Sequence, residues 1–114
     1  MELLVDLAAV TVVLGEPEDT GNFNVRVVGP PGSSPGSDAD RHRLGDVLAA
    51  ANVGRLDAGG DAFVTPDAVR FHAAGQVDAD WTERFDAMCA YATAKGWVDA
   101  DGAIQAHVEW PPAG

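Results

Sequence analysis

Cysteine, lysine and long apolar runs are scarce in this 114-residue chain, and each scarcity excludes a class of protein. Cys89 is the single cysteine, so an internal disulfide is impossible and a reducing compartment is expected. No apolar run approaches the roughly 20 residues that a membrane-spanning helix needs. The first residues, Met-Glu-Leu-Leu-Val-Asp, lack the basic start of a signal peptide. We therefore expect a cytoplasmic protein that does not bind a membrane.

Basic residues are also few. Seven Lys and Arg face 18 Asp and Glu, which gives a formal net charge of −11, and both halves of the chain share the excess. A negative field repels nucleic-acid phosphates and anionic lipid head groups, so it disfavours both as partners and suits a basic protein. A GC-rich coding sequence would give a similar bias, since the chain has 20 Ala and 14 Val but one Lys. The acidity is therefore either functional or compositional.

The length and the hydrophobic pattern predict one α+β domain over residues 1–114. Residues 2–14 are nearly all apolar and predict a buried strand, and residues 23–28 alternate as its hairpin partner. A second hairpin is expected over residues 97–110, with its turn at Asp-Ala-Asp-Gly. The expected sheet is small and antiparallel, built from these two hairpins. Residues 29–36, Gly-Pro-Pro-Gly-Ser-Ser-Pro-Gly, predict a flexible loop.

Two longer segments have the apolar spacing of helices, 38–52 and 80–95. Ser37 is the expected N-cap of the first helix, and Gly54 is its expected stop. The second helix is expected to begin with a capping box at Asp80 and to end at a glycine. These helices, with a possible third, are expected to pack on one face of the sheet.

Residues 66–73 have two interpretations. Thr65 followed by proline favours a short helix, whereas the alternation over residues 69–72 favours a strand; we prefer the helix. Three helices followed by a hairpin is also the order of a winged helix. Residues 80–95 would then be the recognition helix, but their acids have the wrong sign for a major groove.

The short catalytic motifs that the sequence matches lack residues that their chemistry requires. Residues 32–36 match the G-x-S-x-G pattern of a hydrolase nucleophile, but Pro35 follows the serine and has no N–H for an oxyanion hole. No phosphate-binding loop is present in the sequence. Cys89 lies beside an apolar helical stripe and is expected to be a buried small side chain rather than a nucleophile.

Histidines and one carboxylate are the remaining candidates for chemistry. His42, His72 and His107 lack the spacing of a specific metal site, so no metal or cofactor is expected. His107 and Glu109 are two residues apart on one expected strand and would point the same way, as a base and a carboxylate. A wet, solvent-facing strand surface would give the same pattern.

Two classes of function follow from these observations. The favoured class is a non-enzymatic partner-binding or regulatory domain with an acidic surface. The alternative is a small enzyme or ligand-binding subunit with a cleft between sheet and helices that uses His107, Glu109 and His72. A homo-oligomer is compatible with either class.

Overall fold

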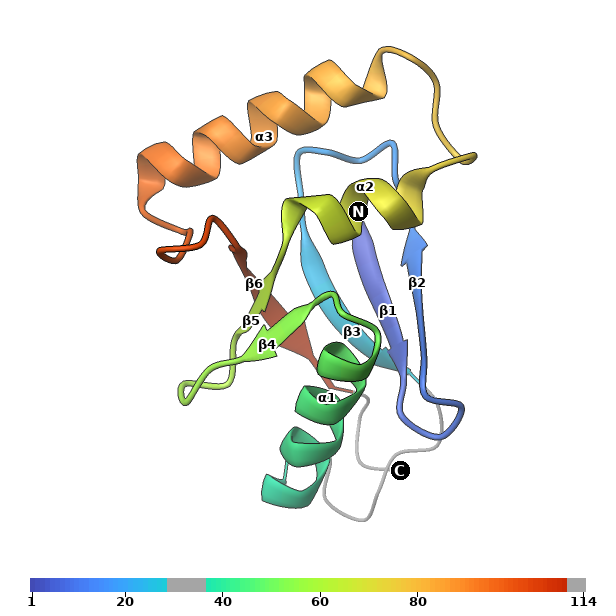
Figure 1. Ribbon diagram of the computed structural model, residues 1–114, viewed down its shortest axis with the longest axis vertical. Coiled ribbons are helices and arrows are strands. Elements are labelled where there is room, and N and C mark those ends of the chain that lie inside the picture. The colour runs from blue at the N-terminus through green and yellow to red at the C-terminus, as the bar shows by residue number, and fades with distance from the viewer. Residues whose placement is uncertain (29–36, 111–114) are drawn as a thin grey trace.

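The computed structural model describes residues 1–28 and 37–110 (Figure 1). The expected flexible loop at 29–36 lies outside the described residues. The elements, in chain order, are β1 (Glu2–Asp6), β2 (Thr11–Gly15), β3 (Asn24–Val28), α1 (Asp38–Ala50), β4 (Gly54–Leu56), β5 (Ala62–Val64), α2 (Pro66–Ala73), α3 (Trp81–Lys95) and β6 (Ile104–Glu109). The α+β class is confirmed, and 66–73 is the short helix.

The sheet is mixed rather than antiparallel, which corrects the expectation from the sequence. Its strand order is β2-β1-β3-β6-β5-β4. The pairs β1–β3 and β3–β6 are parallel, and the pairs β1–β2, β4–β5 and β5–β6 are antiparallel. Parallel pairs join strands that are distant in the chain, so hydrophobic periodicity alone does not reveal them.

The N-terminal hairpin forms inside the segment expected to be one strand. The Asp6 carboxylate accepts hydrogen bonds from the backbone N–H groups of Ala8 and Ala9, both at 2.9 Å, and Val10 has a positive φ of 54°. This local acceptor reverses the chain, so β2 returns beside β1. Residues 24–28 then pair with the other edge of β1, in parallel.

The expected C-terminal hairpin is reduced to a single bridge between Val98 and Ile104. β6 lies in the interior of the sheet instead, where it pairs with β3 on one side and with β5 on the other. The two short strands β4 and β5 were not expected, because three-residue strands carry almost no periodic signal. The winged-helix interpretation is thus wrong for this chain, because the segment expected to form the wing contains β6, which is an inner strand of the sheet.

Helix ends follow local signals with two exceptions. Ser37 accepts a hydrogen bond from the Asp40 N–H as the N-cap of α1, as expected. Gly54 does not end that helix; Asn52 takes the left-handed conformation first, with φ of 58°. Asp80 makes no side-chain cap because its backbone is already helical, and Asp78 accepts from the Trp81 N–H instead.

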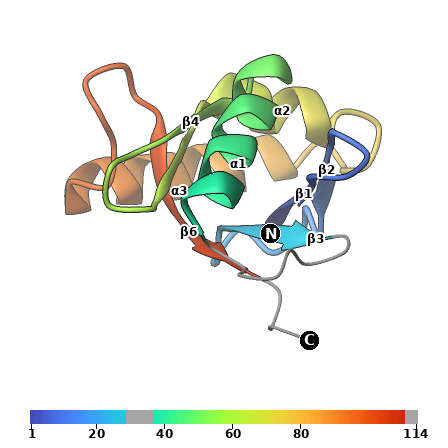
Figure 2. The same cartoon turned by 90° about the horizontal axis from the view of Figure 1, so that it is seen from below.

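Alternate strand residues and the helices form one apolar core. Leu3, Val5, Val25 and Val108 are buried on the same side of the sheet, and the core also contains Phe85 of α3. Seen from below, α1 and α2 lie on one side of β3 and β6 (Figure 2). α3 crosses the end of the sheet rather than its face (Figure 1). The opposite face of the sheet is therefore left without a helix in the described part of the chain.

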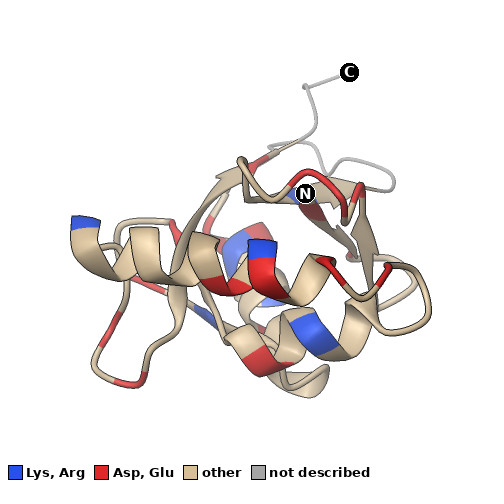
Figure 3. Cartoon of the chain, turned by 90° about the horizontal axis from the view of Figure 1, so that it is seen from above, with Lys and Arg blue, Asp and Glu red and all other residues tan. Residues whose placement is uncertain are grey.

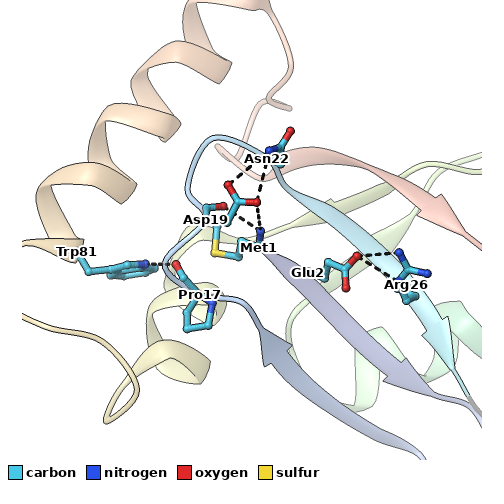
Figure 4. A network of polar contacts seen from close by, with 7 residues as sticks. All are labelled: Met1, Glu2, Pro17, Asp19, Asn22, Arg26 and Trp81. Carbon is cyan, nitrogen blue, oxygen red and sulfur yellow. Dashed lines mark hydrogen bonds and ion pairs between the residues drawn. The ribbon is translucent and has the colours of Figure 1, made fainter.

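A polar network fastens α3 to the strands (Figure 4). The Trp81 indole N–H donates to the carbonyl oxygen of Pro17, in the β2–β3 connection. Nearby, the amino group of Met1 donates to the carbonyl oxygen of Asp19 at 2.9 Å and lies 3.6 Å from its carboxylate. Among the described residues, no helix has the length and apolar character needed to cross a bilayer.

Candidate functional site

The side of the sheet that carries no helix among the described residues, here named the open sheet face, is the candidate functional surface. It carries the strand residues that alternate with the buried ones. They include Glu2, Leu4, Val13, Asn24, Arg26, Arg55, Phe63, Gln105, His107 and Glu109. The face is thus mostly polar, and each of its central strands β1, β3 and β6 carries at least one exposed or half-buried charged or amide side chain.

His107 and Glu109 lie on this face, as the sequence predicted, but they do not act on each other. The Glu109 carboxylate is 2.8 Å from the guanidinium of Arg26, which also binds Glu2 at 2.9 Å. His107 is exposed, and its imidazole makes no hydrogen bond to any described residue. The hydrogen bond from Arg26 lowers the pKa of Glu2, and Glu2 raises the pKa of Arg26 (Figure 4). The carboxylate expected to orient the histidine is therefore part of an ion cluster.

His72 lies elsewhere, on the helical side of the sheet. It is half-buried on α2, and its ring meets that of Phe71 edge to face, with centroids 5.3 Å apart. It borders a separate hollow of about 490 Å³ with Asn52, Thr65 and Asp67. The structure does not bring His72 together with His107.

Cys89 is half-buried beside the core. Burial raises the pKa of its thiol, and the nearby Arg70 offsets this in part. A raised pKa leaves little thiolate at neutral pH, so this cysteine has weak nucleophilic character.

A second charged cluster lies at the β4 end of the open sheet face. The guanidinium of Arg55 sits over the ring of Phe63, 4.5 Å from its centroid, and contacts the Asp99 carboxylate at 3.1 Å. Backbone N–H groups of the turn, first that of Ala103, also bind Asp99 and lower its pKa. Both arginines of this face are therefore already paired with carboxylates.

Between these two clusters, a hollow of about 290 Å³ is lined by Asp61, Trp97, Gln105 and His107. Gln105 and His107 come from β6, and Asp61 directly precedes β5. Trp97 lies beside the edge of β6 that faces away from β5, and its carbonyl oxygen accepts a hydrogen bond from the Gln105 N–H at 2.7 Å. The Gln105 side-chain amide donates to the Asp61 carboxylate at 2.7 Å. Strand pairing thus assembles a carboxylate, an amide, an imidazole and an indole in one place.

Trp97 stands out because a large aromatic side chain is exposed there. It is 47% exposed, and its ring meets that of the 57% exposed Tyr91 edge to face, with centroids 5.8 Å apart. Sequence reasoning did not select Asp61, Trp97 or Gln105. The alternation over residues 104–109 placed Gln105 beside His107, but the register between β5 and β6 was needed to add Asp61.

Acidic residues outnumber basic ones in the chain and are spread over several helices and loops (Figure 3). Four arginines, Arg26, Arg55, Arg70 and Arg84, form ion pairs with carboxylates of the chain. Since the chain has 18 acids against seven bases, most carboxylates stay without a cation of their own. Within residues 1–28 and 37–110, no three His, Cys, Asp or Glu side chains lie close enough to hold a metal ion.

No family model, curated protein or solved structure matches this chain. The side chains of the open sheet face are therefore the basis on which its function is inferred.

Proposed function

We propose that this chain is a non-enzymatic, cytoplasmic protein-interaction domain that binds a basic segment of a partner protein through the open sheet face. The proposal rests on which charged side chains of that face already have a partner of opposite charge. Its two arginines are bound by the chain's own carboxylates, whereas Asp61 shares a hollow with the exposed Trp97 and has no cation within ion-pair distance among the described residues. A positively charged segment complements this arrangement.

The alternative, a small enzyme or ligand-binding subunit, has less support from the geometry. In triad-type catalytic sites the histidine base is oriented by a third, hydrogen-bonded group. The carboxylate of Glu109 binds Arg26 instead, and His72 lies on the other side of the sheet. The proposal also holds that nucleic acid is not the partner, because a net negative chain repels phosphates. A gel shift with duplex DNA at physiological salt should accordingly show no saturable complex.

The proposal is tested with fluorescein-labelled 12-residue peptides that are matched in length and carry arginine and aromatic residues, neutral residues, or acidic residues. Fluorescence anisotropy should show binding of the basic peptides alone, with an affinity that falls as salt is added. Acidic peptides that bind as well as the basic ones would contradict the proposal.

Two variants with the same change in charge locate the binding surface. Gln105→Lys adds a positive charge to the open sheet face, and Thr82→Lys adds one on the exposed side of α3. We expect Gln105→Lys to weaken binding of the basic peptides strongly and Thr82→Lys to weaken it only slightly. Equal losses in both variants would show that the peptides respond to overall charge and not to this face.

A further inference from the structure

The hollow beside β6 has the parts needed to hold one guanidinium group. Asp61 and Trp97 line it together with Gln105 and His107, so a carboxylate and an indole border the same hollow. Gln105 fixes the position of the carboxylate through the 2.7 Å hydrogen bond from its side-chain amide. Asp61 has no Lys or Arg within ion-pair distance in the described part of the chain, so the carboxylate lacks a counterion beside an exposed aromatic ring.

The chain binds its own guanidinium groups with this same combination twice. Arg55 lies over Phe63 and contacts the carboxylate of Asp99. Arg70 lies over the ring of Phe85, 5.2 Å from its centroid, and contacts the carboxylate of Asp86 at 2.9 Å. In both places the guanidinium carbon lies over a ring while its nitrogens contact a carboxylate. The hollow offers the ring and the acid without the cation.

We propose that this hollow binds an arginine side chain of the partner protein, with the guanidinium on the Trp97 indole and paired to Asp61. The proposal rests on the proposed function and names the side chain that the open sheet face selects. Arginine fits better than lysine, because the planar guanidinium stacks on an indole and presents several N–H groups to a carboxylate at once. A peptide-bound arginine fits better than free arginine, whose α-carboxylate the acidic surface repels.

The test uses the tripeptide Ac-Gly-Arg-Gly-amide as the probe and follows the ¹⁵N-labelled protein by NMR. Titration should shift the indole N–H signal of Trp97 and the side-chain amide of Gln105 in a saturable way. The indole N–H signal of Trp81 should not shift, because this side chain is 2% exposed and donates a hydrogen bond to the carbonyl oxygen of Pro17. The citrulline analogue, which has the same shape without the charge, should give no saturable shift, and the lysine analogue should bind more weakly.

Three variants separate the pocket from the general charge. Asp61→Asn and Trp97→Leu should each weaken binding of the arginine tripeptide by roughly two- to fivefold, the usual scale for a partly exposed ion pair or cation–π contact. Asp80→Asn is the control, because it removes one negative charge, as Asp61→Asn does, at an exposed residue whose side chain does not cap α3. It should leave the affinity for the arginine tripeptide unchanged. The NMR spectrum of each variant also reports whether it is folded.

Several results would overturn the proposal. Absence of a shift at Trp97, an equal response to the citrulline analogue, or an equal loss in Asp80→Asn would each remove the guanidinium site. Tighter binding of free L-arginine than of the tripeptide would assign the hollow to a small molecule. If the arginine tripeptide fails while the longer basic peptides still bind, this inference is wrong and the interaction function stands. If neither kind of peptide binds, both are wrong.

Discussion

Replacing Phe85 by alanine should remove one of the main supports of the core. Phe85 is the largest side chain with less than 2% exposure, and its ring stacks on that of Trp81, with centroids 4.8 Å apart and planes 6° apart. Emptying a buried phenylalanine site costs about 3–5 kcal/mol, because apolar contacts are lost and a cavity remains. A domain of this size is typically stable by about 5–15 kcal/mol, so the variant should lose a large part of its stability.

Urea denaturation followed by tryptophan fluorescence measures the loss. With a slope of about 1.5 kcal/mol per molar urea, the midpoint should fall by roughly 2–3 M. Tyr91→Ala is the matched control, since it truncates an aromatic residue of the same helix that is 57% exposed. The control should cost about 1 kcal/mol or less. A loss below about 1 kcal/mol for Phe85→Ala would refute the placement of α3 against the core.

Three further predictions concern backbone space, pH and the open sheet face. Gly54→Ala should destabilise the protein by more than about 2 kcal/mol, because a Cβ there would collide with the backbone of β5. Gly45→Ala should instead stabilise α1 by about 0.5–1 kcal/mol, because a Cβ there would have nothing within 4 Å. Chemical denaturation of the two variants measures both effects. Arg26 holds the pKa of Glu2 below its ordinary value of 4.5, so the unfolded chain binds this proton first. The free energy of unfolding should therefore fall as the pH drops through 4.5 toward the folded pKa, and Glu2→Gln should flatten that part of the stability profile, measured by thermal melts. His107→Gln should change stability by no more than about 0.5 kcal/mol in urea melts, since the imidazole is exposed; a larger loss would mean that it has a structural partner.

Elements defined by local chemistry could be predicted from the sequence. Ser37 and Thr65 accept cap hydrogen bonds at the starts of α1 and α2, and Gly96 ends α3 in the left-handed conformation, with φ of 78°. Each of these signals lies within a few residues of the structure that it determines. Asp80 does not cap α3 because its backbone is already helical, with φ of −75° and ψ of −19°, and a capping side chain requires an extended backbone.

Sheet order could not be predicted, because it depends on contacts between distant residues. Val25 pairs with Val108, which lies far along the chain, and no turn motif joins their strands. The candidate site shows the same division. His107 and Glu109 were correctly placed on one face by alternation, whereas Asp61 joined them through a register that only the folded sheet reveals. Glu109 is paired with Arg26 of β3, and this ion pair could not be predicted from the sequence either.

The central position of β6 has a consequence for how the chain folds during synthesis. β6 is the last of the described elements to leave the ribosome, yet it is the strand that joins β2-β1-β3 to β5-β4. Until residues 104–109 emerge, β3 and β5 each present an unpaired inner edge to the surrounding solution. Vectorial synthesis therefore holds the two halves of this sheet apart until nearly the whole described chain is made. During that interval the net negative charge of the chain opposes association of these edges with other nascent chains.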